Sequence, residues 1–319
     1  MKRKYKHLFG PVPSRRLGRS LGIDLVPFKT CSFDCIFCQL GKTTDKTLTR
    51  AEYVDLDAVI EELDAWLHTG DSADYITLSG SGEPTLNSRF GEVIEFARSA
   101  TSIPVALLTN GSLLDNPEVR AQAARANLVK VSLSAWDQSS LDHINRPHAD
   151  IAFTRLVEGL RLLRKECAGT IWMEVFLVWG SNTTTRAVAE IAKLAKTIGP
   201  DRIQLNTAVR PPCEEYALAV PQDRMKRLAC AFDPPAQVIA EYASTLSGKG
   251  GVDETEIRKL VARRPCTLEQ ICQVFGLHKN HASKYVGKLM RGGIIREQRT
   301  ARETFYCGVR KEDDEYANV

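Results

Sequence analysis

The 319-residue sequence has no long apolar run, and its number of cysteines is odd. No histidine stands beside its three most closely spaced cysteines. Its longest apolar region, 171–180, is interrupted by Glu174, whereas a membrane helix needs about 20 consecutive apolar residues. The basic N-terminus is followed by no apolar run, so we expect neither a secretion signal nor a membrane anchor. Nine cysteines spread over most of the chain argue against a disulfide scaffold. We therefore expect a cytoplasmic protein.

The net charge of +4 is too small to indicate nucleic acid binding by itself, but the basic residues are unevenly distributed. Between Asp253 and Lys311 there are thirteen Lys and Arg against six Asp and Glu. The run Glu312-Asp313-Asp314-Glu315 then reverses the sign. This distribution predicts a basic C-terminal domain with an acidic tail at 312–319.

Short β-branched runs alternate with longer amphipathic segments from Leu21 to Leu205. Six strands are predicted, at Leu21–Val26, Tyr75–Ser79, Pro104–Thr109, Leu128–Ser134, Ile171–Val178 and Arg202–Leu205. Serial βα units indicate an α/β fold with a parallel sheet. Periodicity alone leaves two architectures open, an open doubly wound sheet and an incomplete barrel. Both place ligand sites at the carboxyl ends of the strands.

A glycine-rich segment divides the chain. Residues 247–252 contain Ser-Gly-Lys-Gly-Gly and are predicted to be a linker, so that residues 1–246 form the α/β domain. Beyond it we expect helices at Thr255–Arg263, Thr267–Phe275 and Lys279–Arg291, then strands at Ile294–Gln298 and Thr304–Cys307. Helix, helix-turn-helix and hairpin together resemble a winged helix domain over 253–311.

Three cysteines lie within eight residues, in the segment Cys31-Ser-Phe-Asp-Cys35-Ile-Phe-Cys38. A closed zinc site needs four protein ligands, and the next histidine after Cys38 is the distant His68. Three thiolates suit an iron-sulfur cluster, in which each cysteine binds one iron. A cluster of four irons would then leave one iron for a ligand that is not protein. A zinc knuckle or a trio of buried cysteines would match the bare spacing as well.

Polar and glycine-rich segments follow the other predicted strands. They contribute Gly80, Gly82 and Glu83 after the second strand, Asn110 after the third, Ser134 after the fourth and Asn206 after the sixth. Glycines let the backbone approach a ligand closely. An ordinary turn is the alternative for Ser79–Pro84 taken alone, and Asn110-Gly111 is also a common turn pair.

C-x3-C-x2-C after a first strand, with Phe37 before the last cysteine, resembles the cysteine loop of radical S-adenosylmethionine (SAM) enzymes. Gly80-Ser81-Gly82-Glu83-Pro84 is similar to that family's glycine-glycine-glutamate-proline motif, with one serine inserted. The resemblance implies a partial (β/α)6 TIM barrel.

It also implies a 4Fe-4S cluster on the three cysteines, with SAM on the open iron. Gly80, Gly82 and Glu83 would lie near the methionine amino group, and Ser134, Asn206 and Asn110 would supply further SAM contacts. The implied reaction is reductive cleavage of SAM to a 5'-deoxyadenosyl radical, with an electron from flavodoxin or ferredoxin.

Several blocks, among them "GPVPSRRLGRSLGIDLVP" and "QLNTAVRPP", resemble the radical SAM enzymes grouped with the tRNA wyosine synthases. The archaeal synthases carry a second cluster on cysteines that precede the radical motif, but no cysteine here precedes Cys31. The substrate is therefore open, with RNA as one hypothesis. Arg15, Arg16 and Arg19 have two interpretations, a solvated face or a contact with phosphates or a substrate carboxylate.

An alternative function is an iron-sulfur regulator that senses redox state and binds nucleic acid. Several basic residues lie on the last predicted helix and the hairpin, namely Lys279, Lys284, Lys288, Arg291, Arg296, Arg299 and Arg302. They suit phosphate contacts, and a surface that binds protein is the competing interpretation.

Overall fold

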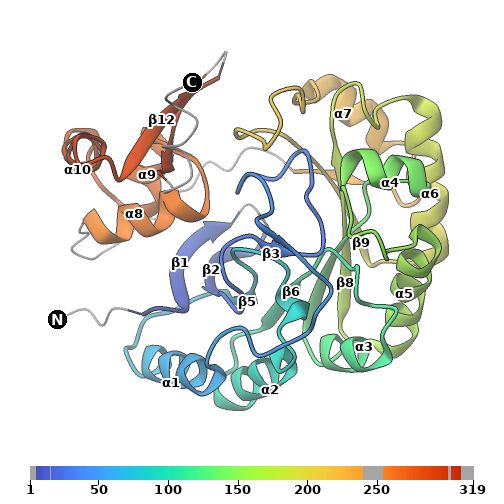
Figure 1. The fold of residues 1–319 in the computed structure, drawn as a ribbon, viewed down its shortest axis with the longest axis horizontal. Coiled ribbons are helices and arrows are strands. Elements are labelled where there is room, and N and C mark those ends of the chain that lie inside the picture. Colours follow the sequence, from blue (N-terminus) through green and yellow to red (C-terminus); the bar gives the residue numbers. More distant parts are fainter. Residues whose placement is uncertain (1–4, 15, 240–253, 301–302, 310–319) are drawn as a thin grey trace. The chain divides into compact units, whose positions relative to one another are not determined.

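The computed structural model describes residues 5–14, 16–239, 254–300 and 303–309 (Figure 1). The chain forms two compact units, Met1–Glu241 and Tyr242–Val319, and each is described by itself. Arg15, Arg302, the predicted linker at 247–252 and the predicted tail at 312–319 lie outside the described residues.

The first unit is built on an eight-stranded, mostly parallel sheet with the order β1-β2-β5-β6-β7-β8-β9-β10. All six predicted strands occur: β2 (Gly18–Ile23), β5 (Tyr75–Leu78), β6 (Val105–Leu108), β7 (Leu128–Ser132), β8 (Thr170–Leu177) and β9 (Arg202–Thr207). They pair in parallel in that order. Figure 1 shows the strands inside a curved outer layer of helices. The α/β fold with a partial barrel is confirmed.

Two flanking strands were not predicted. β1 (Leu8–Ser14) pairs antiparallel with β2, and β10 (Gln237–Val238) pairs in parallel with β9. β1 contains Pro11 and Pro13, which cannot donate to a sheet ladder and are tolerated on edge strands. Its position at one end of the strand order agrees with that rule.

The helices of the first unit bury one apolar face each. They are α1 (Leu56–Leu67), α2 (Phe90–Ala100), α3 (Pro117–Ala123), α4 (Gln138–Ile144), α5 (Phe153–Glu166), α6 (Thr185–Ile198) and α7 (Gln222–Ala229). In α1, Asp55 caps the first turn by accepting from the Ala58 amide, and Leu56, Val59 and Leu63 are buried. An amphipathic stripe of this kind packs a helix onto a sheet.

Alternate side chains of strand β8 face different apolar groups on the two sides of the sheet. Ile171, Met173 and Val175 belong to the large core that includes the helices. Trp172 and Phe176 point the other way and belong to two smaller apolar groups, since successive strand residues face opposite sides. Glu174 lies between Trp172 and Phe176 on that inner face and is buried.

The second unit contains α8 (Glu254–Arg263), β11 (Cys266–Thr267), α9 (Leu268–Phe275), α10 (Lys279–Arg291), β12 (Ile295–Arg299) and β13 (Thr304–Gly308). Its antiparallel strands have the order β11-β13-β12. Thr267 and Gln270 form a capping box at the start of α9, and Gly276 ends that helix in the left-handed conformation. The predicted helices and hairpin occur, while the winged helix assignment stays a prediction.

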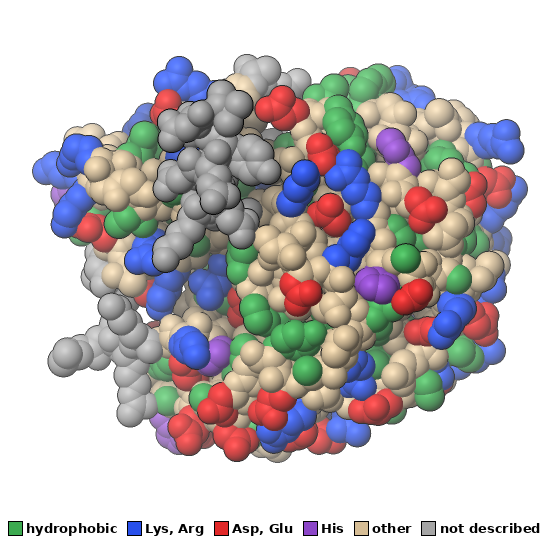
Figure 2. Space-filling model, viewed as in Figure 1, with side chains coloured by type: hydrophobic (Ala, Val, Ile, Leu, Met, Phe, Trp, Pro, Cys, Tyr) green, Lys and Arg blue, Asp and Glu red, His purple; other side chains and the backbone are tan. Residues whose placement is uncertain are grey.

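Among the helices that the structure describes, none combines the length and apolar character of a membrane span. Figure 2 shows acidic and basic side chains interspersed over the visible face of the first unit. That face presents no broad region of one sign that would indicate a partner.

Candidate cofactor site

The cysteine loop, residues 31–38, follows β2 at the carboxyl end of the sheet. Cys31 lies in the short strand β3 (Thr30–Cys31), which pairs with β4 (Asp45–Lys46). On its other side the loop is fastened to the segment after α4, since the Ile36 amide donates to the Ile144 carbonyl at 3.0 Å. All three cysteines are partly buried. The loop is therefore fixed by backbone bonds to distant parts of the chain.

Each cysteine sulfur has a polar neighbour that donates toward it. The Lys29 Nζ atom lies 3.2 Å from Cys38 Sγ, and Asn145 Nδ2 lies 3.3 Å from Cys35 Sγ. A longer contact of 3.7 Å joins Asn110 Nδ2 to Cys31 Sγ. Hydrogen bonds to sulfur and nearby charge are the features with which a protein tunes an iron-sulfur cluster.

Lys29 is a buried cation, with 2% of its surface exposed. Burial opposes its charge, but the neighbouring Cys38 and Cys31 outweigh burial and raise the pKa of the amine. The lysine therefore stays charged beside the thiols. The sequence interpretation missed Lys29 and Asn145. Lys29 stands two residues before the first cysteine, and Asn145 belongs to the block Ile144–His148, for which a turn is a competing interpretation. Neither signal indicates a contact with a cysteine, and folding brings Asn145 to Cys35 from 110 positions away.

Burial raises the pKa of two of the three thiols, Cys31 and Cys35. Burial, followed by the charge of Glu83, raises the pKa of Cys31 to about 12. Burial, followed by the charges of Cys38 and Cys31, also raises the pKa of Cys35 well above its ordinary value. A metal must displace these protons to bind the sulfurs.

The donor set fits an iron-sulfur cluster better than a single ion. Among the described residues, no three Cys, His, Asp or Glu side chains are grouped closely enough to hold one metal ion. Cys31, Cys35 and Cys38 nevertheless come from one eight-residue loop, and each sulfur has its own polar donor. In a cubane each sulfur binds a different iron, so its ligands stand farther apart than those of one ion.

The glycines after β5 allow the next loop to lie directly on the cysteine loop. A Cβ atom on Gly82 would stand 1.9 Å from the Thr30 carbonyl oxygen, and one on Gly80 would stand 2.7 Å from the Asp24 carboxylate. Gly80 also has a φ of +130°, which side chains rarely adopt. The Glu83 amide donates to the Thr30 carbonyl at 3.1 Å. Both positions therefore require glycine.

The inserted Ser81 has a defined place in this contact. Its amide and hydroxyl donate to the two oxygens of Asp24, at 3.0 and 2.5 Å. Its carbonyl accepts from the Lys29 amide at 2.7 Å. The serine that departs from the family motif thus joins the segments after β2 and β5.

Glu83 ties the ends of β5 and β6 together. Its Oε1 atom accepts from the Thr85 and Thr109 hydroxyls, both at 2.7 Å, and its Oε2 atom accepts from the Asn110 amide at 2.7 Å. Burial raises the pKa of this carboxyl, and these hydrogen bonds oppose the rise. The carboxylate therefore positions the loop that carries Asn110, and its SAM contact stays a prediction.

The remaining predicted contacts are buried and hydrogen-bonded. Asn110 Nδ2 donates to Ser32 Oγ at 2.8 Å, beside Cys31. Ser134 Oγ accepts from the Phe176 amide at 3.0 Å, and Asn206 Nδ2 donates to Glu174 Oε1 at 2.7 Å. The structure thus places the cysteine loop and Asn110 together, and it places Ser134 just after β7 and Asn206 near the carboxyl end of β9.

An ion triad that the sequence interpretation missed lies beneath Asn206. Glu174 Oε2 pairs with Arg16 Nη1 at 2.6 Å and with Lys130 Nζ. Burial opposes ionisation of Glu174, but Arg16 and Lys130 outweigh it and hold the pKa of this carboxyl far below its usual range. Glu174 and Lys130 each interrupt an apolar strand, which was the available signal.

Of the other cysteines, Cys213 lies close to the cysteine loop, and three belong to the second unit. Cys213 is partly buried, and burial and then the charges of Asp34, Glu214 and Cys38 raise the pKa of its thiol to about 11. The Glu214 amide, next to Cys213, donates to the Ile36 carbonyl at 2.9 Å, so Cys213 lies beside the cysteine loop. Cys266, Cys272 and Cys307 belong to the second unit, which gives no support to an auxiliary cluster there.

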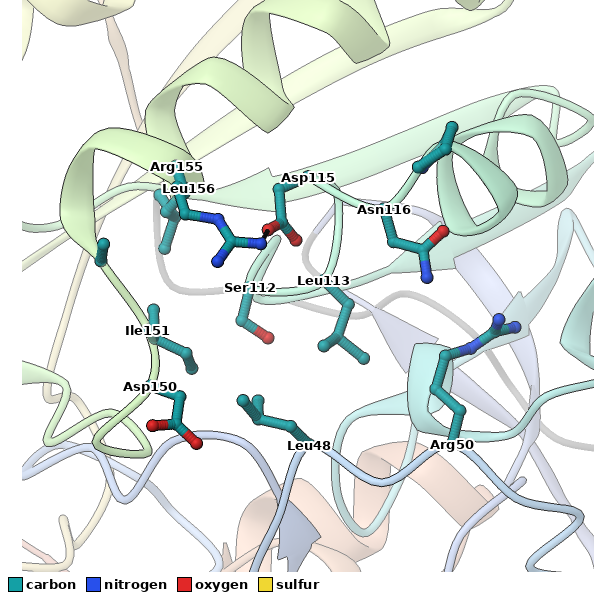
Figure 3. A pocket seen from close by; sticks show the side chains of 12 residues that line it. Leu48, Arg50, Ser112, Leu113, Asp115, Asn116, Asp150, Ile151, Arg155 and Leu156 are labelled. Atoms are coloured by element: carbon teal, nitrogen blue, oxygen red, sulfur yellow. Dashed lines mark ion pairs between the residues drawn. The ribbon is translucent and has the colours of Figure 1, made fainter.

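A cavity of about 490 Å³ is lined by residues that follow β6 and by residues around the start of α5 (Figure 3). Arg155 and Asp115 form an ion pair at its wall, and Arg50, Leu48 and Ser112 also line it. Ser112 connects it to the loop, because its hydroxyl lies 2.6 Å from the Ser32 hydroxyl. None of the predicted cofactor residues lines this cavity.

Comparison with known proteins agrees with this site. Residues 25–195 match the Radical SAM superfamily. The chain is 32% identical over 243 residues to a UPF0026 protein of Methanocaldococcus jannaschii, covering 76% of this chain and 74% of that protein. It is also 36% identical over 301 residues to a protein of Brachyspira hyodysenteriae named GTPase Obg, covering 93% of this chain but only 44% of that protein.

A solved structure shares the fold. A radical SAM methyltransferase of Sphaerobacter thermophilus superposes with a TM-score of 0.51 at 20% identity, covering 69% of this chain and 65% of that one. At this identity the likeness concerns the fold.

Proposed function

The chain belongs to the Radical SAM superfamily and is a radical SAM enzyme that uses a 4Fe-4S cluster and SAM, and from that premise we propose that Cys31, Cys35 and Cys38 hold the cluster. The observation that carries this assignment is the convergence of three partly buried thiols with donors at each sulfur. When bound, the cluster and SAM supply reductive cleavage to methionine and a 5'-deoxyadenosyl radical, which abstracts hydrogen from a substrate.

The residues around the loop each have a role in this proposal. Gly80 and Gly82 let the chain lie close to the cysteine loop, so that their backbone groups reach the methionine amino group. Glu83 holds that segment and the Asn110 loop in place. Ser134 and Asn206 bind SAM from the carboxyl ends of β7 and β9. Lys29 offsets the negative charge of the thiolates and keeps water from the sulfurs by filling the space beside Cys38.

The test is anaerobic reconstitution with iron and sulfide, reduction with dithionite, and measurement of 5'-deoxyadenosine released from SAM. Cys35→Ala is the blank, because it removes one ligand. Equal release from the blank, or no release from wild type with an intact cluster, would contradict the assignment. The physiological electron donor, flavodoxin or ferredoxin, and a cytoplasmic location stay predictions.

We also propose that the second unit is a winged helix domain that binds nucleic acid, which would bring an RNA substrate to the barrel. The support is a group of exposed basic side chains on α10 and β12: Lys279, Lys284, Lys288, Arg291, Arg296 and Arg299. Such groups contact phosphates. Salt-dependent tRNA binding tests this proposal, and binding that is absent or independent of salt would count against it. The redox-sensing regulator is disfavoured, because a sensor has no need of a SAM site.

A further inference from the structure

The inner face of the sheet holds more positive than negative charge at the ion triad. Arg16 and Lys130 share the single carboxylate of Glu174. The side chains of Lys130 and Glu174 are 9% and 8% exposed, so the three charges are largely removed from water. The opposing charges of Arg16 and Lys130 keep Glu174 ionised, and the triad therefore carries one net positive charge.

The side chain of Arg16 keeps 17% of its surface exposed, and its one described bond from the side chain uses Nη1. A guanidinium carries five N–H donors in a planar fork that matches a carboxylate or a phosphate. Arg16 therefore has both the charge and the donors to receive an anion.

Two neighbouring polar side chains have buried atoms without a hydrogen-bond partner. They are Nε1 of Trp172, which is 7% exposed, and Oε1 of Gln204, which is 5% exposed. Trp172 stands beside Lys130 in the β7–β8 register, and Gln204 stands beside Glu174 in the β8–β9 register. Buried polar atoms normally have partners. Trp172 Nε1 is a donor and can bond to an anion, whereas Gln204 Oε1 is an acceptor and can bond only to a protonated group of the ligand.

On the inner face of β8, the triad lies next to a residue that contacts the cysteine loop. Phe176 follows Glu174 on the inner face of β8, and its ring stacks on Phe37 with centroids 4.0 Å apart. Phe37 directly precedes Cys38. On the other side, Leu17, Leu128 and Trp172 pack together in an apolar group. A group bound at the triad would be held between that apolar floor and the cofactors.

We propose that the Arg16–Lys130–Glu174 triad binds an anionic group of the substrate, a carboxylate or a phosphate. Glu174 fixes the two cations and, through Asn206 at 2.7 Å, connects their position to the predicted SAM contact. The proposal rests on the radical SAM function, and it names the substrate chemistry that this function leaves open.

The experiment measures anion binding to the reconstituted holoprotein with SAM present. Thermal unfolding is followed while sodium phosphate or sodium acetate replaces sodium chloride at constant ionic strength. A ligand that binds only the folded state raises the unfolding temperature with concentration. We expect one of the two anions to stabilise the protein saturably. Stabilisation by phosphate alone assigns a phosphorylated substrate, and stabilisation by acetate alone assigns a carboxylate.

Three variants make the test specific. Arg16→Gln should weaken the apparent affinity by about tenfold, the scale of a charge-assisted hydrogen bond, and Arg16→Lys should restore part of it. Arg19→Gln is the matched control, because this arginine lies three residues further along, in β2, is partly buried and donates to Ser72 Oγ at 2.8 Å, away from the triad. It should bind like wild type. If Arg16→Gln is too unstable to measure, the anion affinity of Arg16→Lys is compared with that of wild type, and a lower affinity in the variant supports the proposal.

Three outcomes would overturn the inference: no saturable stabilisation with SAM present, equal affinity in wild type and the Arg16 variants, or stabilisation that occurs only when SAM is left out. The last would mean that the anion occupies the SAM carboxylate position. The release of 5'-deoxyadenosine from the same wild-type preparation separates the two failures. Release without anion binding rejects the triad only, whereas no release rejects the proposed cofactor site.

Discussion

The two compact units place their charged and polar residues in opposite ways. In the first unit Lys29, Glu83 and Glu174 are buried, and each is held by specific partners. In the second unit Lys279 and Lys284 on α10 are exposed. Burial of a charge is costly unless partners compensate it, whereas exposed ion pairs contribute little. The first arrangement therefore indicates a site of fixed geometry, and the second a surface that tolerates many ligands.

This difference predicts that single substitutions in the first unit will have large, position-specific effects, and that those in the second will have small, additive effects. The following experiments test that contrast, beginning with the largest expected effect.

Replacing any of Cys31, Cys35 and Cys38 by alanine should abolish the iron-sulfur cluster, because each thiolate binds a different iron. Iron content and visible absorption after reconstitution measure the loss. Cys167→Ala is the matched control, since this buried cysteine packs in the helix-side core. It should retain the cluster. A cluster in all three loop variants would remove the basis of the assignment.

Glu174→Gln should lower barrel stability at pH 7 by up to about 3–5 kcal/mol, the cost of breaking a buried ion pair. Because the folded-state pKa of Glu174 lies below its unfolded value of about 4.3, its stabilisation is fully present above that value. The stabilisation is lost as the pH falls toward the folded-state pKa. The difference in unfolding free energy between wild type and variant should therefore shrink on acidification.

Tryptophan fluorescence is a suitable probe, because all four tryptophans lie in the first unit. Glu190→Gln serves as control, since this exposed residue pairs with Lys193 on α6 and should change stability little at any pH. A difference that stays constant down to pH 3 would show that Glu174 is not an ionised partner of Arg16 and Lys130.

Gly82→Ala should destabilise the first unit by about 1–3 kcal/mol, the usual cost of overpacking, because the new Cβ would meet the Thr30 carbonyl. Gly287→Ala is the corresponding change in the second unit. Its Cβ would approach only the end of the Arg291 side chain, at 3.4 Å, and alanine favours a helix by about 0.5–1 kcal/mol.

Denaturation followed by tryptophan fluorescence for Gly82→Ala, and by circular dichroism for Gly287→Ala, measures the two effects. We expect Gly82→Ala to lower the free energy of unfolding and Gly287→Ala to raise it. Destabilisation of both variants to the same extent would mean that the cysteine loop imposes no special packing constraint.

The sequence predicted the sheet well, because strand formation depends on local patterns. Six strands and the C-terminal helices were found within a few residues, whereas β1 was missed because two prolines interrupt it. The cysteines and the glycine segment could be identified because their spacing is itself the signal.

The partners of those motifs could not be predicted, because they depend on packing between distant segments. Asn145 reaches Cys35 across 110 positions, and Arg16 reaches Glu174 across 158. Glu174 was interpreted only as an interruption of an apolar run. The structure shows that Glu174 forms ion pairs with Arg16 and Lys130 on the inner face of the sheet.

Lys29→Met should lower the reduction potential of the cluster, because loss of a buried cation disfavours the more negative reduced state. The buried ammonium lies 3.2 Å from Cys38 Sγ. A redox titration followed by electron paramagnetic resonance measures the change. Lys42→Met is the control, since Lys42 is exposed close to the same loop and its charge is screened by water. An equal potential shift in both variants would show that burial of Lys29 does not matter.

The smallest effect is expected from Lys284→Ala on α10. If this exposed lysine contacts one phosphate, its removal should weaken tRNA binding several-fold at low salt. It should also reduce the slope of log K against log salt by about 0.7–0.9, the contribution of one released counterion. Fluorescence anisotropy between 50 and 200 mM salt, a range suited to such measurements, gives both numbers.

Lys193→Ala on α6 is the matched control from the first unit, where Lys193 is exposed and paired with Glu190. Identical slopes for wild type and both variants would remove α10 from the nucleic acid surface, while the cluster of the first unit should be unchanged throughout. A loss of iron from Lys284→Ala would instead break the contrast between the units, because an exposed residue would then act on the buried site.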